Sequence, residues 1–192
     1  MTLYSLVLFV HVAGVLSLFA VLTVEVLALF RLRRASTLNE VRLWINPVPG
    51  LPLAATGSLL AVLFSGLYLI IRMSAFGEAW PRVTIAAMLL VAPIAGATAR
   101  RMSAIRRACA ASTAISAELQ SLLHDPVLKI SLGIRISVVL GIVLLMGAKP
   151  GLWESVGIVG ASVALGVVSP FLTLRHAPPL SAPRANPETR SE

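Results

Sequence analysis

Residues 4–30 read YSLVLFVHVAGVLSLFAVLTVEVLALF, and the basic run RLRR at 31–34 follows at once. A helix of roughly 20 apolar residues crosses the hydrocarbon core of a bilayer, so this stretch can span it with some tilt. It contains one histidine, His11, and one acidic residue, Glu25. Ionisable groups are costly in hydrocarbon, so we predict a transmembrane helix whose His11 and Glu25 face protein rather than lipid.

The composition of the whole chain agrees with a membrane protein. Of its 192 residues, 57% are hydrophobic and only 12% are charged, which is unlike a soluble domain. The net charge of +8 arises from basic residues between the apolar stretches, where they set topology, and we expect no nucleic-acid partner. The single cysteine, Cys109, excludes a disulfide within the chain and a CxxC metal site.

Apolar stretches recur along the chain and predict an all-α, polytopic bundle of five transmembrane helices, which forms one domain over residues 1–175. Two segments, 37–46 and 100–123, are amphipathic and are expected to lie on the cytoplasmic membrane surface. Thr37 and Glu40 fit a helix capping box. Residues 176–192 are polar and rich in proline, and they predict a disordered tail. The expected spans are 4–30, 53–71, 83–99, 127–148 and 152–174.

The distribution of lysine and arginine predicts the orientation of the bundle. With the N-terminus outside, twelve basic residues fall on the cytoplasmic side, three fall outside and one, Arg135, lies within a span. This bias predicts a multi-pass protein of the inner (plasma) membrane with its N-terminus out and its C-terminus in. The twelve are Arg31, Arg33, Arg34, Arg42, Arg100, Arg101, Arg106, Arg107, Lys129, Arg175, Arg184 and Arg190, and the three are Arg72, Arg82 and Lys149.

Small residues at four-residue spacing predict where these helices approach one another closely. Such patterns let the backbones of two membrane helices come into contact. Four sets occur in the predicted spans: Gly57, Ala61 and Ser65; Ala92 and Gly96; Gly133, Ser137 and Gly141; Gly157 and Ala161.

Three segments carry a resemblance to known families. HVAGVLSLF from residue 11, SGLYL from residue 65 and HDPVLKISLGIRISVVLGIVLLMGAKP from residue 124 resemble a group of small bacterial membrane proteins that share a domain of unknown function. The resemblance implies four or five helices. The spacing of His11 and Gly14 is also similar to the first helix of the copper-resistance D proteins and of the haem-bearing protoporphyrinogen-oxidase membrane family. In the haem family a histidine at this place is an axial ligand, which implies that role for His11.

His11 is therefore a candidate ligand of haem b or copper. The other histidines, His124 and His176, fall on the predicted cytoplasmic side, so one subunit cannot supply a second histidine. Methionine is the remaining partner type, and imidazole with thioether suits Cu(I) or a His/Met haem. The methionines at the predicted outer ends of their spans are Met73, Met88 and Met146. The alternative is that His11 forms a hydrogen bond with a neighbouring helix and that the methionines are packing residues.

Glu25 and Arg135 form a second candidate site. They are opposite charges on the first and fourth spans, which run antiparallel, and both lie nearer the predicted cytoplasmic end. We predict that they form an intramembrane ion pair. Alternatively, Arg135 reaches the lipid headgroups or Glu25 is protonated.

The sequence leaves three functional readings open. No nucleophile elbow, HExxH motif, P-loop or intramembrane carboxylate pair is present, which favours a function other than catalysis. The first reading is a structural or interaction protein, such as an accessory subunit with a membrane-protein partner or a homo-oligomer in the bilayer. The second is a redox or metal-handling protein that uses His11. The third is a small transporter that uses Glu25 and Arg135.

Overall fold

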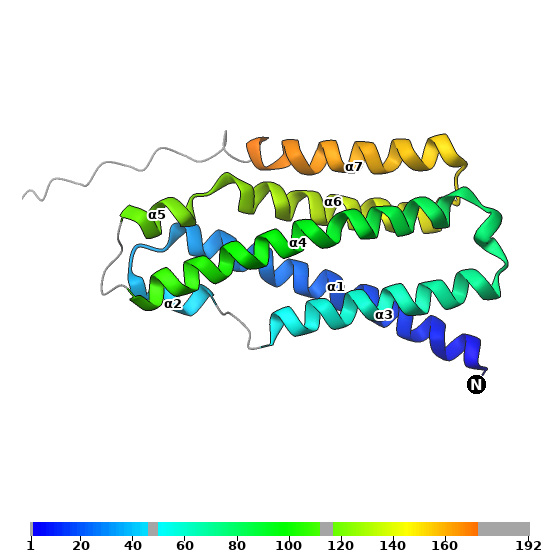
Figure 1. The fold of residues 1–192 in the computed structure, drawn as a ribbon, viewed down its shortest axis with the longest axis horizontal. Helices are drawn as coiled ribbons and strands as arrows, with labels where there is room; N and C mark the ends of the chain where they lie inside the picture. Colours follow the sequence, from blue (N-terminus) through cyan, green and yellow to red (C-terminus); the bar gives the residue numbers. More distant parts are fainter. Residues whose placement is uncertain (1, 46–49, 112–116, 173–192) are drawn as a thin grey trace, which may run out of the picture.

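The fold is known from a computed structural model that describes residues 2–45, 50–111 and 117–172. Within these ranges the chain is helical and contains no strand, so the predicted all-α class is confirmed (Figure 1). The predicted tail, 176–192, and the end of the fifth span, 173–174, lie outside the described residues. The elements are α1 (Leu3–Arg34), α2 (Leu38–Ile45), α3 (Leu51–Arg72), η1 (Ala75–Gly77), α4 (Ala79–Ala111), α5 (Ala117–Leu123), α6 (Pro126–Ala148) and α7 (Leu152–Leu172).

Five helices of the described chain are long and apolar enough to cross a membrane, which supports a multi-pass membrane protein. They are α1, α3, α4, α7 and the stretch Leu119–Ala148 that contains α6. Figure 1 shows the long helices lying side by side, with the short helices α2 and α5 at one end of the bundle. α6 packs against α7 and α4, and α1 packs against α3.

The helix ends follow from local sequence. Asp125 caps α6 by accepting a hydrogen bond from the Val127 N–H at 2.9 Å, and Pro126 occupies the first turn, where no N–H is required. The predicted capping box of α2 is confirmed, because Thr37 Oγ1 accepts from the Glu40 N–H at 3.3 Å while the Glu40 carboxylate accepts from Thr37. Hydrogen bonds from the N–H groups of Ser36 and Thr37 lower the pKa of Glu40 below its ordinary value.

The predicted third span, 83–99, and the predicted surface segment, 100–123, meet inside a helix rather than at a helix end, and the membrane boundary between them stays a prediction. α4 runs without interruption from Ala79 to Ala111, through Arg100 and Arg101. The reason is that residues 97–111 contain no glycine or proline and are rich in alanine and arginine, which favour helix. At 33 residues α4 is about 50 Å long, so it is longer than the roughly 30 Å hydrocarbon core.

A compact apolar layer closes the end of the bundle where α2 and α5 lie. Leu32, Val41 and Leu119 have no exposed surface, and Ile105 and Cys109 are almost as deeply buried. These side chains come from α1, α2, α4 and α5, and they pack on the first turns of α6. The layer therefore packs the basic C-terminal part of α4, from Arg100 to Ala111, against the ends of α1 and α6.

Only some of the predicted small-residue contacts occur. Gly133 and Gly141 of α6 lie directly against α7, and Gly133 faces Gly166. A Cβ atom on Gly57, Gly96 or Gly157 would meet no atom within 4 Å outside its own helix, so the close approaches predicted there are absent. No neighbouring helix of the described chain lies against these three positions. Gly166, which the sequence pattern missed, does make a close approach, because a Cβ there would overlap Ile134 Cα.

We predict that Gly166→Ala destabilises the protein and that Gly160→Ala, in the same helix, does not. A Cβ on Gly166 would lie 2.7 Å from the Ile134 backbone nitrogen, whereas one on Gly160 would meet nothing within 4 Å. Overpacking of this kind costs about 1–3 kcal/mol. Thermal unfolding in detergent measures both variants, and equal melting temperatures would contradict the α6–α7 contact.

The predicted orientation can be tested with reporter fusions. The excess of basic residues predicts that a reporter fused after Leu174 is active only in the cytoplasm, and that one inserted at Phe76 is active only outside. Cytoplasmic activity at Phe76 with external activity after Leu174 would reverse the orientation.

Candidate functional site

The structure brings Glu25 of α1 and Arg135 of α6 together. Arg135 Nη1 lies 2.7 Å from Glu25 Oε2, which is the distance of a charge-assisted hydrogen bond. The Arg135 side chain is 7% exposed and that of Glu25 is 26% exposed. The Arg135 guanidinium is therefore shielded from solvent, whereas the Glu25 carboxylate is partly accessible to it.

The two helices present these residues at matching heights. Glu25 is nine residues from the end of α1 at Arg34, and Arg135 is nine residues from the start of α6 at Pro126. At 1.5 Å per residue both lie about 14 Å from the same end of the bundle. Because α1 extends through the basic run to Arg34, neither side chain has to reach along the axis to meet its partner.

A cavity of about 840 Å³ lies beside the pair, and Glu25 and Arg135 are both in its wall. Its lining comes from α1, α2, α3, α4 and α6, with α3 on one side and α4 on the other. Thr56, Thr98 and Ser103 add hydroxyl groups to an otherwise largely apolar wall. The apolar residues include Ala28, Leu29, Ile45, Leu51, Leu59, Ala92, Ala95, Ala99, Leu128 and Leu132.

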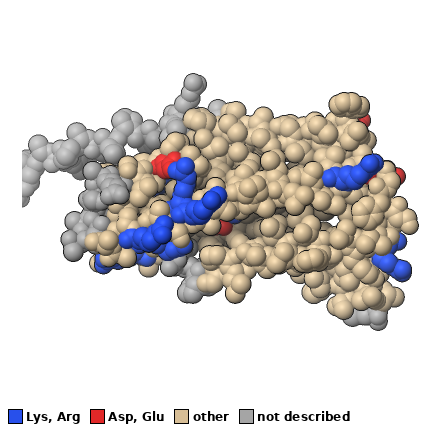
Figure 2. Space-filling model, viewed as in Figure 1, with Lys and Arg blue, Asp and Glu red and all other residues tan. Residues whose placement is uncertain are grey.

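One end of this cavity is cationic. Arg100, Arg106 and Arg107 of α4 belong to its lining, whereas the intervening Arg101 points to an ion pair with Asp125. Figure 2 shows lysine and arginine side chains gathered at this end of the visible face, next to a hollow. We refer to Arg100, Arg106 and Arg107 as the arginine rim.

His11 is placed by a polar contact with the neighbouring helix. Its Nδ1 lies 3.0 Å from Ser65 Oγ of α3, and its side chain is buried. Gly66 leaves room for the ring, because a Cβ there would lie 3.1 Å from His11 Cε1. This arrangement is the alternative in which His11 forms a hydrogen bond with a neighbouring helix.

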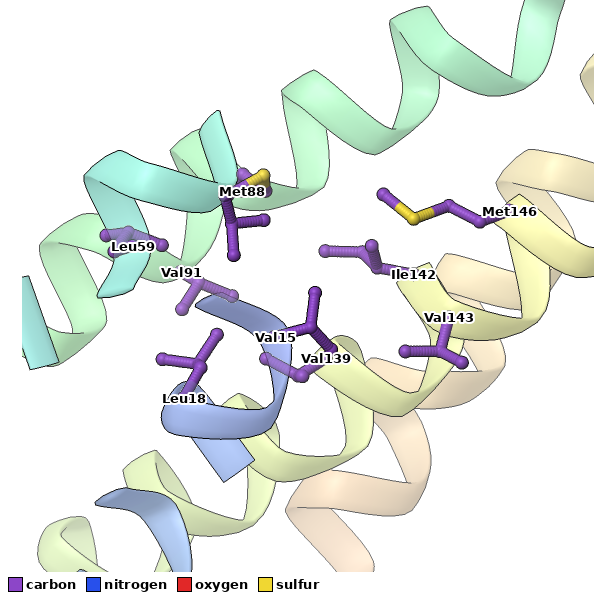
Figure 3. A pocket seen from close by; sticks show the side chains of 10 residues that line it. Val15, Leu18, Leu59, Met88, Val91, Val139, Ile142, Val143 and Met146 are labelled. Atoms are coloured by element: carbon purple, nitrogen blue, oxygen red, sulfur yellow. The ribbon is translucent and has the colours of Figure 1, made fainter. Parts of the chain in front are cut away.

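The methionines that could have joined His11 lie elsewhere. Met88 and Met146 line a cavity of about 30 Å³ together with eight other side chains, all apolar, and His11 is not among them (Figure 3). A space of this size holds one or two water molecules at most, so it cannot take a haem. Met73 follows the last residue of α3 and is 48% exposed.

The structure therefore does not bring His11, Met73, Met88 and Met146 into one site. In the described ranges, no group of three or more His, Cys, Asp or Glu side chains could hold a metal ion. The role of His11 as a ligand of haem or copper stays a prediction. No protein-family model, curated protein or solved structure matches the chain.

Sequence reasoning missed the cavity and the arginine rim, although α4 carries a signal. Its lining residues recur at intervals of three and four, which places them on one helix face. The side chains on this face are small from Ala92 to Ala99, and the face becomes basic at Arg100. Small residues on a transmembrane face usually indicate close helix packing, but here they leave space instead.

The ion pair predicts coupled effects of substitution. Glu25→Gln or Arg135→Gln alone leaves the other charge without its partner, which costs up to about 3–5 kcal/mol for a fully buried pair and less here because Glu25 is partly exposed. Glu25→Arg combined with Arg135→Glu should recover much of the loss. The measurement is thermal stability in detergent for the two Gln variants and for the cycle of Glu25→Arg, Arg135→Glu and their combination.

The matched control is Arg101→Gln, which removes an arginine from a more exposed ion pair. Its expected loss is within about 1 kcal/mol, the usual range for surface pairs. Strictly additive losses at Glu25 and Arg135 would show that the two side chains do not interact.

Proposed function

We propose that the protein is a small membrane carrier whose solute enters the cavity between α3 and α4 and binds beside Glu25 and Arg135. The observation that carries this proposal is an ion pair at transmembrane depth in the wall of a cavity of about 840 Å³. A purely structural subunit would have no need of a polar site next to an open volume. Small-molecule sites typically measure roughly 300–1,000 Å³, so the cavity has a suitable size.

The free-energy cost of burying two charges favours a functional rather than a stabilising role for the pair. Removing two charges from water costs several kcal/mol per ion, while their attraction at close contact is about 4 kcal/mol at an effective dielectric constant of 20. Such a pair gives little net stability, and apolar residues could replace it at no loss. Its presence in a cavity wall favours a role in binding.

The geometry leaves binding capacity at Glu25. Its carboxylate is partly exposed and could accept a hydrogen bond from a solute donor without breaking the pair. Arg135, whose side chain is almost fully buried, holds that carboxylate in the cavity wall.

The first requirement of this proposal is that water-soluble molecules reach the cavity. We predict that Thr56→Cys in phosphatidylcholine nanodiscs reacts with a membrane-impermeant maleimide at least several times faster than Gly57→Cys. Thr56 lines the cavity, whereas Gly57 is the next residue, lies at the same depth and is not part of the lining. Wild-type protein, whose Cys109 is buried, sets the background rate. Equal rates at the two positions would refute the carrier proposal.

A further inference from the structure

We propose that the cavity binds one phospholipid with an anionic headgroup from the cytoplasmic leaflet, with its phosphate on the arginine rim and its acyl chains along the apolar wall. This inference rests on the proposed function, because it names the class of molecule that the cavity takes. Four observations carry it: the charge of the lining, the level of the rim, the apolar wall and the exposure of the cavity.

The distribution of charge in the cavity lining favours an anionic ligand and indicates where its anionic group binds. Arg135 is balanced by Glu25, so the inner part of the cavity has no net charge. No carboxylate whose side chain the structure describes forms an ion pair with the three rim arginines. Arg106 Nη2 donates to Ser103 Oγ at 3.0 Å, which holds its guanidinium at the cavity wall. An anionic group is therefore attracted to the rim rather than to the inner pair.

The arginine rim lies at the height along α4 where lipid headgroups are expected. Residues 83–99 of α4 separate Arg82 from Arg100, and these 17 helical residues measure about 26 Å, close to the roughly 30 Å thickness of the hydrocarbon core. Arg100 to Arg107 then cover about 10 Å beyond the core, where phosphates lie. By the predicted orientation, this is the cytoplasmic side. Lipid phosphates are thus already at the height of the guanidinium groups.

The wall below the rim suits hydrocarbon. On α4 the lining extends from Arg107 to Ala92, a distance of about 22 Å along the helix. Pro52, Ala92 and Ala99 supply exposed apolar surface from α3 and α4, and the buried side chains of Leu29, Leu128 and Leu132 close the back of the cavity. A free phosphate ion would leave this surface in contact with water, and a zwitterionic lipid would bring a cation to the rim. An anionic phospholipid can place its phosphate on the arginine rim and its acyl chains on the apolar wall.

The cavity is also open to the surface of the bundle. α3 packs against α1 and α4 packs against α6, so α3 and α4 form opposite walls. Thr56, Ala92 and Ala99, which belong to these walls, are exposed. A lipid could therefore enter between α3 and α4 without separating the packed helix pairs.

Native mass spectrometry of protein released from nanodiscs tests the assignment. The nanodiscs contain equal amounts of phosphatidylglycerol and phosphatidylcholine with the same acyl chains. We expect wild-type protein to retain one phosphatidylglycerol in preference to phosphatidylcholine. Basic residues near a membrane surface contribute about 1 kcal/mol each, so Arg106→Gln with Arg107→Gln should reduce the preference roughly thirtyfold.

The matched control is Arg31→Gln with Arg34→Gln. It removes the same charge at the same end of the bundle, but neither residue lines the cavity, and Arg34 lies over the Phe30 ring. We expect it to keep the wild-type preference. An equal loss in both double variants would show that only the general surface charge attracts the lipid, and it would overturn the assignment.

Maleimide labelling of Thr56→Cys separates failure of this inference from failure of the proposed function. We expect phosphatidylglycerol to slow labelling several-fold relative to phosphatidylcholine alone, and inorganic phosphate to leave it unchanged. Fast labelling that phosphatidylglycerol does not slow would refute the lipid and leave the carrier proposal standing. Protection by inorganic phosphate would replace the lipid with a soluble anion. Labelling no faster than in Gly57→Cys would refute both proposals.

Discussion

The ion pair between Glu25 and Arg135 is the constraint on which the rest of the account depends. Two charges within long apolar helices are tolerable only if each finds its partner, because an unpaired charge in a low dielectric is far more costly than the pair. The pair therefore fixes the relative height of α1 and α6, which present the two residues at equal distance from one end of the bundle. It also gives a largely apolar cavity wall a polar centre.

Helix packing explains why space remains beside this pair. α6 and α7 approach closely at Gly133, Gly141 and Gly166, while α1 and α3 meet around Gly14 and the contact of His11 with Ser65. These contacts join the helices into two close pairs, and α4 is attached to the first of them through α6. α3 and α4 are left facing each other across the cavity. The apolar layer around Leu32 and Val41 holds the ends together without filling that space.

The sequence was sufficient to predict the helical class, five candidate spans and the two residues that pair. Long apolar stretches and rare charges within them are strong signals, because lipid imposes a large penalty on any alternative. Sequence could not predict where small residues permit contact and where they leave a cavity. The pattern of Ala92 and Gly96 resembles that of Gly133 and Ser137, yet only the second lies against another helix. The outcome depends on which helices are neighbours, and that is a property of the whole bundle.

The continuation of α4 beyond Ala99 shows a related limit. Charge pattern locates the membrane boundary, but helix propensity decides where a helix ends, and the two signals differ at Arg100. The basic half of α4 is thereby held rigidly next to the cavity, and Arg100, Arg106 and Arg107 come into its lining. For His11, a histidine in the first span is compatible with ligation or with a hydrogen bond, and only the positions of Ser65 and the methionines distinguish them.

The ionisation state of Glu25 tests the central claim most directly. Infrared difference spectra between wild-type protein and Glu25→Gln, recorded at neutral pH in lipid, isolate the vibration of this one carboxyl group. An ion pair with Arg135 predicts that the substitution removes a carboxylate band. Loss of a protonated-carboxyl band instead would mean that Glu25 is neutral in the membrane, and it would contradict the pair.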